Sequence, residues 1–166
     1  KKATLTLSGT EQRYYLVHEG DKLAALTNLF DIEPITSALI FVRTRVETGQ
    51  LASQLSARGF PAEAIHGDLE QNAREQILGR FRAGQIKVLV ATDVAARGLD
   101  IENISHVFNY HLPDDAEVYV HRIGRTGRAG KTGIAISLFA PRDKRRLREI
   151  EHMTKQALTL GKLPTA

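Results

Sequence analysis

The sequence predicts one α/β domain built on a parallel β-sheet with helices on both faces. Short apolar segments, such as residues 37–42 and 87–91, alternate with segments in which apolar residues recur at helical spacing. A strand buried on both faces of a parallel sheet has this continuous apolar character, and strand–helix alternation is typical of such sheets. The length of 166 residues suits a single domain with a full hydrophobic core.

The expected strands lie between residues that favour turns or helix caps. In the first expected strand, residues 13–18, the Tyr and Val residues favour extended structure. Continuous apolar runs indicate the buried strands that follow. Pro113 interrupts the chain after the fifth strand. The strands are expected at residues 13–18, 37–42, 62–66, 87–91, 106–110 and 133–139.

The expected helices begin at capping residues and end at glycine or proline. Asp21, Thr44 and Asp115 are suitable N-caps. Pro34 ends the first helix and Gly59 occupies the position after the second, where glycine is favoured. Helices are expected at residues 22–30, 45–58, 71–82, 116–123 and 142–155, with a short helical turn after residue 93.

Composition narrows the class of protein. The net charge of +4 permits a polyanionic partner without requiring one. No run of about 18 apolar residues is present, so no membrane span is expected. Cysteine is absent, which excludes disulfides and thiolate metal sites. We expect a cytoplasmic domain over residues 1–166, with residues 156–166 beginning a linker, and we assign no metal ligand.

Polar groups follow the predicted strands at their carboxyl ends, where ligands collect in parallel sheets. We expect these groups to lie at one edge of the sheet. They are Arg43, Thr44, His66, Gly67, Asp68, Thr92, Asp93, Arg97 and Gly98.

An arginine-rich segment, HRIGRTGR at residues 121–128, follows the fifth expected helix. Its three arginines, Arg122, Arg125 and Arg128, are spaced three residues apart. Arginine is rarely buried without a partner, and its planar, permanently charged guanidinium suits phosphate oxygens. A solvated basic loop is the simpler alternative.

The chain as a whole resembles the C-terminal RecA-like domain of a DEAD-box ATP-dependent RNA helicase. Its motif sequences are most similar to those of the bacterial cold-shock group. The resemblance covers residues 13–153. It includes LIFVRTR at 39–45, HGD at 66–68 with QNAR at 71–74, ATDVAARGLDI at 91–101 and the segment at 121–128. The sequence lacks a Walker A loop and an Asp-Glu-Ala-Asp motif, which this family carries on its N-terminal domain. The resemblance therefore implies half of a motor.

The resemblance also implies roles for individual residues. Arg125 and Arg128 match arginine fingers that act on ATP, whereas His121 and Arg122 match residues that face the partner domain. Gly98 and Asp100 match the nucleotide-side residues, Asp100 toward the ribose. ATP and Mg²⁺ are expected to be bound mainly by the missing N-terminal domain. The residues that match RNA-backbone contacts are Arg43, Thr44, Gly67, Asp68, Gln71, Arg74, Thr92 and Arg97.

Each of these assignments has a simpler structural alternative. Arg122 can form an ion pair within the domain, and Asp100 can cap a turn. Gln71 and Arg74 can lie on a solvated helix face. We interpret Phe81 as core, and the basic run at 142–148 as the outward face of the last helix.

The expected partners are RNA of any sequence and the N-terminal RecA-like domain, with further C-terminal domains possible. Two alternative functions stay open. One is a non-catalytic RecA-like module that binds RNA or a protein, and the other is a DNA-directed enzyme of the same superfamily. The presence of all three arginines at 121–128 argues against the binding module. The sequences of the motifs at 39–45 and 91–101 argue against the DNA-directed enzyme.

Overall fold

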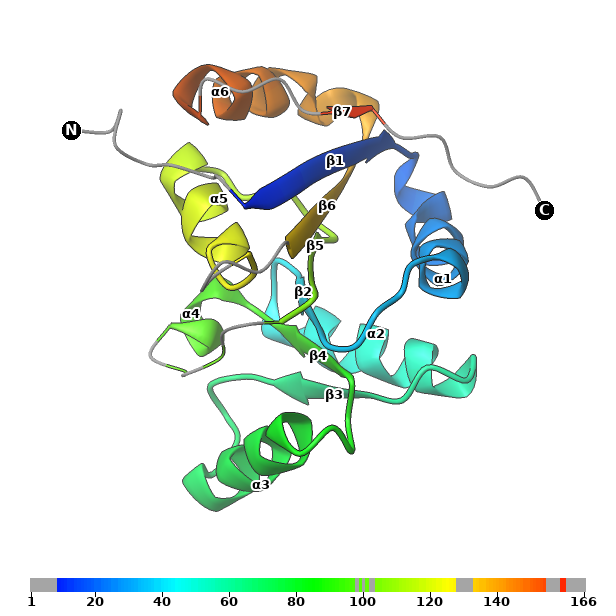
Figure 1. Cartoon of the computed structure of the whole chain (residues 1–166), viewed down its shortest axis with the longest axis vertical. Coiled ribbons are helices and arrows are strands. Elements are labelled where there is room, and N and C mark those ends of the chain that lie inside the picture. The colour runs from blue at the N-terminus through cyan, green and yellow to red at the C-terminus, as the bar shows by residue number, and fades with distance from the viewer. Residues whose placement is uncertain are drawn as a thin grey trace.

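The computed structural model describes residues 9–97, 99, 101, 104–127, 133–154 and 159–160. Within these residues the chain forms one seven-stranded sheet with the order β3-β4-β2-β5-β6-β1-β7 (Figure 1). Every adjacent pair of strands is parallel. The predicted fold class is confirmed.

Six strands lie where the sequence predicts them, within a few residues at each end. The seventh, β7, was not predicted, because two residues are too short to show any periodicity. It pairs with β1 and lies in the segment expected to begin a linker, which otherwise stays a prediction. The strands are β1 (Thr10–Leu16), β2 (Ala38–Phe41), β3 (Ala62–Ile65), β4 (Val88–Ala91), β5 (His106–Asn109), β6 (Gly133–Phe139) and β7 (Thr159–Leu160).

The helices also follow the predictions, with two local differences. Asp21 precedes the first α-helix, but its side chain makes no capping hydrogen bond because it already belongs to a 3-10 turn. The last helix starts later than predicted, after a 3-10 turn in which buried Asp143 accepts a hydrogen bond from the Ala140 amide. Gly59 follows its helix with φ +91°, as a C-terminal glycine should. The helical elements are η2 (Glu19–Asp21), α1 (Lys22–Ile32), α2 (Arg45–Ala57), α3 (Gln71–Arg82), α4 (Asp93–Ala96), α5 (Ala116–Ile123), η3 (Pro141–Asp143) and α6 (Lys144–Thr154).

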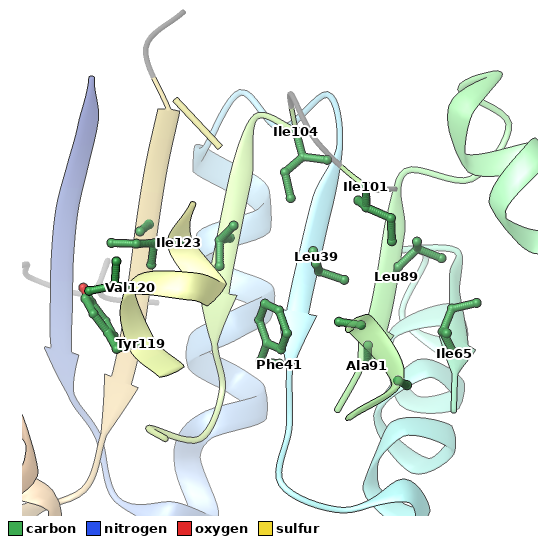
Figure 2. Close-up of a cluster of buried hydrophobic side chains, with 14 of the residues drawn as sticks. Leu39, Phe41, Ile65, Leu89, Ala91, Ile101, Ile104, Tyr119, Val120 and Ile123 are labelled. Atoms are coloured by element: carbon green, nitrogen blue, oxygen red, sulfur yellow. The ribbon is translucent and has the colours of Figure 1, made fainter. Parts of the chain in front are cut away.

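Helices cover both faces of the sheet. Because side chains alternate along a strand, Leu39 and Phe41 of β2 face one cluster of buried residues and Ile40 faces the other. The first cluster includes side chains of α3, α4, α5 and α6, among them the core residue Phe81. Figure 2 shows Tyr119, Val120 and Ile123 of α5 in front of the strands. The second cluster includes side chains of α1 and α2. Burial on both faces explains the continuous apolar runs in the sequence.

The carboxyl ends of the central strands meet at one edge. Phe41, the last residue of β2, lies opposite Ala91 of β4 on one side and Asn109 of β5 on the other. The residues that follow these three strands therefore emerge at the same level. Because the chain turns to opposite sides of β2 when it forms β4 and β5, this is a switch point of the sheet, where such folds bind ligands.

No helix in the described part of the chain is long and apolar enough to cross a membrane.

Candidate functional site

A cleft of about 200 Å³ opens at this edge of the sheet. The end of β2, the helices α4 and α5, Arg97 directly after α4 and Arg125 two residues after α5 line it. Most of its polar side chains are cationic, so the cleft suits an anionic group. It is lined by Phe41, Asp93, Ala96, Arg97, Val118, His121, Arg122 and Arg125.

Arg122 is fixed within the domain and is only 4% exposed. Its Nε and Nη2 donate to the two carboxylate oxygens of Asp93 at 2.7 and 2.8 Å. Its Nη1 donates to Asn109 Oδ1 at 2.9 Å and to the carbonyl oxygen of His111 at 2.7 Å. The guanidinium also lies 4.9 Å from the centre of the Phe41 ring. Arg122 thus joins α5 to α4, to the end of β5 and to β2.

Arg125 has a different environment. It is half-buried, and its Nη1 donates to the carbonyl oxygens of Leu99 at 2.9 Å and Ile101 at 3.3 Å. Its Nη2 donates to the carbonyl oxygen of Ala96 at 3.0 Å. These bonds to neutral main-chain groups orient the guanidinium at the cleft without cancelling its charge.

The other predicted nucleotide-side residues are placed only in part. His121 is exposed on the last turn of α5 and lines the cleft. Arg97, which was matched to an RNA contact, is also exposed and lines this cleft. Gly98, Asp100 and Arg128 lie outside the described residues, so their assignments stay predictions.

The residues matched to RNA contacts form a surface beside the cleft. Arg43 and Thr44 are exposed in the loop after β2, and Thr44 caps α2 in a reciprocal capping box with Glu47. Arg45 forms an exposed ion pair with Asp68, which follows β3. This pair, which sequence reasoning did not anticipate, connects the first residue of α2 to the loop after β3.

Further along this surface the predicted contacts differ in accessibility. Gln71 is exposed at the start of α3, and Arg74 is half-buried with one hydrogen bond from Nη2 to the Ala95 carbonyl oxygen at 3.4 Å. Arg74 Nε is buried without a partner among the described residues. Thr92 is only 7% exposed, and its hydroxyl oxygen accepts from the Ala95 amide as the cap of α4. Thr92 is therefore less accessible to a ligand than Gln71 or the exposed Gly67.

Sequence reasoning missed His111, which follows β5. Its Nδ1 accepts a hydrogen bond from the Arg43 amide at 3.1 Å, and its Nε2 lies 3.7 Å from a Glu47 carboxylate oxygen. Burial, aided by the positive charge of Lys22, lowers the pKa of His111 to about 4. The only available signal was a polar residue directly after an apolar strand, which by itself indicates no role.

This pKa predicts an acid-sensitive contribution to stability. An unfolded histidine binds a proton near pH 6.5, whereas folded His111 does so only near pH 4. Neutral His111 therefore makes its full contribution to the free energy of unfolding above pH 6.5. This contribution falls as the pH drops toward 4 and is lower by about 2 kcal/mol at pH 5. Urea denaturation at pH 7.5 and 5.0 should show a smaller acid loss for His111→Asn than for the wild type. Equal losses would contradict the assignment.

A parallel sheet with a cleft at its switch point is the arrangement in which open α/β domains bind ligands, and the fold matches the RecA-like domains of DEAD-box proteins. Residues 21–130 match the helicase conserved C-terminal domain family. The chain belongs to this family. It is 37% identical to the C-terminal domain of the DEAD-box protein Dbp5 and covers 89% of that chain, so it lies in the DEAD-box branch.

Individual relatives agree with this assignment. The chain is 50% identical to the DEAD-box ATP-dependent RNA helicase CshA of Bacillus licheniformis over 165 residues. This match covers 99% of the chain and 34% of that relative. A DEAD box protein from Methanococcus jannaschii superposes with a TM-score of 0.86 at 44% identity, covering 93% of this chain and 42% of that one. Dbp5 of S. cerevisiae bound to RNA and ADP BeF3 gives a TM-score of 0.89 at 35% identity, covering 97% and 44%. The chain thus spans about a third of the length of its curated relative.

Proposed function

We propose that this chain is the second half of a cytoplasmic, ATP-dependent RNA helicase. It supplies arginines to ATP held by an N-terminal RecA-like domain and binds the RNA sugar-phosphate backbone, so that ATP-driven closure of the two domains unwinds short RNA duplexes. The observation that carries the proposal is the geometry of the cleft. There a fixed arginine, Arg122, lies near the end of α5, and Arg125, three residues later and beyond the helix, is oriented by neutral carbonyl groups.

The chemistry of the cleft fits the phosphate end of a nucleotide. Its volume of about 200 Å³ is below that of a typical complete ligand pocket, and the sequence has no P-loop of its own. Arg125 would face the phosphates, with Arg128 assigned by resemblance. Arg97, although matched to an RNA contact, lines the same cleft and would add a positive charge there. ATP supplies the phosphoryl group and Mg²⁺ neutralises charge on it, both held mainly by the other domain.

The adjoining surface fits a nucleic-acid backbone. Arg43, Thr44 and Gly67 present a guanidinium, a hydroxyl and accessible main chain in the loops after β2 and β3, the two strands that border β4. Such groups contact phosphates and sugars, which carry no sequence information. The structurally similar Dbp5 was solved bound to RNA and ADP BeF3, which supports the proposal that a protein of this kind binds both RNA and a nucleotide.

A non-catalytic module that binds RNA or a protein is the second candidate. The Arg45–Asp68 ion pair favours it in part, because it neutralises a positive charge on the proposed RNA surface. The orientation of Arg125 toward a cationic cleft favours the helicase, because a simple binder gains nothing from it.

Phosphate release separates these candidates. The isolated chain should show no RNA-stimulated ATP hydrolysis, because the P-loop and the magnesium-binding carboxylate are absent from its sequence. A two-domain protein, in which this chain follows the N-terminal domain of Bacillus licheniformis CshA, should hydrolyse ATP when RNA is added. RNA-stimulated turnover by the isolated chain, in proportion to its purity, would contradict the half-motor proposal. A two-domain protein that binds RNA without hydrolysis would favour the binding module.

A further inference from the structure

His111 makes three hydrogen bonds that lead to three different segments. Its amide donates to the carbonyl oxygen of Phe41 at 3.4 Å, at the end of β2. Its Nδ1 accepts from the amide of Arg43 at 3.1 Å, in the loop after β2. Its carbonyl oxygen accepts from Nη1 of Arg122 at 2.7 Å, on α5. One residue thus contacts both the proposed RNA loop and the arginine that shapes the nucleotide cleft.

The surroundings of His111 hold it in place. The side chain is 7% exposed, and the preceding residue is also bonded on both sides. The Tyr110 amide donates to the Phe41 carbonyl oxygen at 3.0 Å, and the buried Lys22 Nζ donates to the Tyr110 carbonyl oxygen at 2.8 Å. A ring held in this way cannot change its position without moving its partners.

The protonation state of His111 suits the bond to the loop. Burial keeps the imidazole neutral at physiological pH, and only a neutral ring has a nitrogen lone pair that can accept from the Arg43 amide. Nε2 then carries the proton and faces the Glu47 carboxylate. Glu47 in turn accepts from both the amide and the hydroxyl of Thr44, so the same loop is held at a second point.

We infer that His111 is a positioning residue that couples the RNA loop at Arg43 and Thr44 to Arg122, and through it to the nucleotide cleft. The inference rests on the proposed function. RNA contacts that shift the loop act on the ring through the Arg43 amide, and the His111 carbonyl transmits the shift to the Arg122 guanidinium. The two ligands then bind with a shared coupling free energy, and each strengthens the binding of the other.

The test uses the two-domain protein and three variants. His111→Leu removes the acceptor, whereas His111→Asn retains an oxygen near the position of Nδ1. The control, His106→Leu, removes another buried histidine of the same sheet, which lies at the amino end of β5 and contacts Glu33 instead. For each protein, the affinity for single-stranded RNA is measured with and without ADP–beryllium fluoride, and thermal unfolding establishes that it is folded.

The decisive quantity is the ratio of the two RNA affinities. We expect His111→Leu to lower this ratio by about tenfold or more, His111→Asn to keep it within about threefold, and the control to leave it unchanged. An unchanged ratio in His111→Leu, or an equal fall in the control, would overturn the inference. A wild-type protein whose RNA affinity does not respond to the nucleotide analogue, and which shows no RNA-stimulated hydrolysis, would instead overturn the proposed function.

Discussion

Replacement of Arg125 by lysine is expected to lower ATP turnover of the two-domain protein at saturating ATP and RNA by about 10²-fold or more. An arginine finger contributes on the order of 10³–10⁵ to turnover in related phosphoryl-transfer enzymes, and here Arg125 and Arg128 are proposed to share that effect. Lysine keeps the charge but lacks the planar fork that bonds to the carbonyl oxygens of Ala96, Leu99 and Ile101. A 10²-fold loss corresponds to about 2.7 kcal/mol of transition-state stabilisation, and Arg128→Lys should behave similarly.

Arg145→Lys is the matched control for this prediction. Arg145 is exposed on α6 and lines no part of the cleft, so its replacement should leave turnover unchanged. RNA affinity without nucleotide should change little in Arg125→Lys. If RNA affinity collapses while turnover at saturation survives, the arginine segment is an RNA-binding surface and the assignment of Arg125 is wrong.

Replacement of Arg122 by methionine should lower the free energy of unfolding of the isolated chain by about 3–5 kcal/mol. The substitution removes the two-point ion pair with Asp93 and leaves the buried oxygens of Asn109 and His111 without their donor. Methionine retains most of the side-chain volume above Phe41, so the loss reports mainly on polar contacts. Urea denaturation at neutral pH measures the difference.

Arg45→Met gives the corresponding control on the surface. Arg45 also pairs with an aspartate, but the side chains of Arg45 and Asp68 are 59% and 67% exposed. Water solvates both charges when the pair is broken, so the expected loss is below about 1 kcal/mol. Similar losses of unfolding free energy for Arg122→Met and Arg45→Met would show that the contacts of Arg122 do not stabilise the domain.

The local pattern of the chain predicts six strands, the α-helices and the edge at which the polar groups gather. Strands such as β2 and β4 are buried on both faces, so their apolar runs are visible without any knowledge of their neighbours. Thr44 and Asp115 act as N-caps through bonds to amides two or three residues away. These contacts are local, and sequence spacing is enough to predict them.

Tertiary contacts decide the role of each polar side chain at the site. Arg122 and Asp93 are 29 residues apart, and Arg43 and His111 are 68 apart. They meet only because β2 lies between β4 and β5, an order that hydrophobic periodicity does not encode. The motif at 121–128 therefore predicts a group of arginines, but not that Arg122 is held by an ion pair while Arg125 is held by carbonyl groups. The sequence by itself determined the elements and the edge of the sheet, since these depend on burial and local bonds. The strand order decided which charges are neutralised and which remain available to a phosphate, because pairing between distant residues depends on their distance in space.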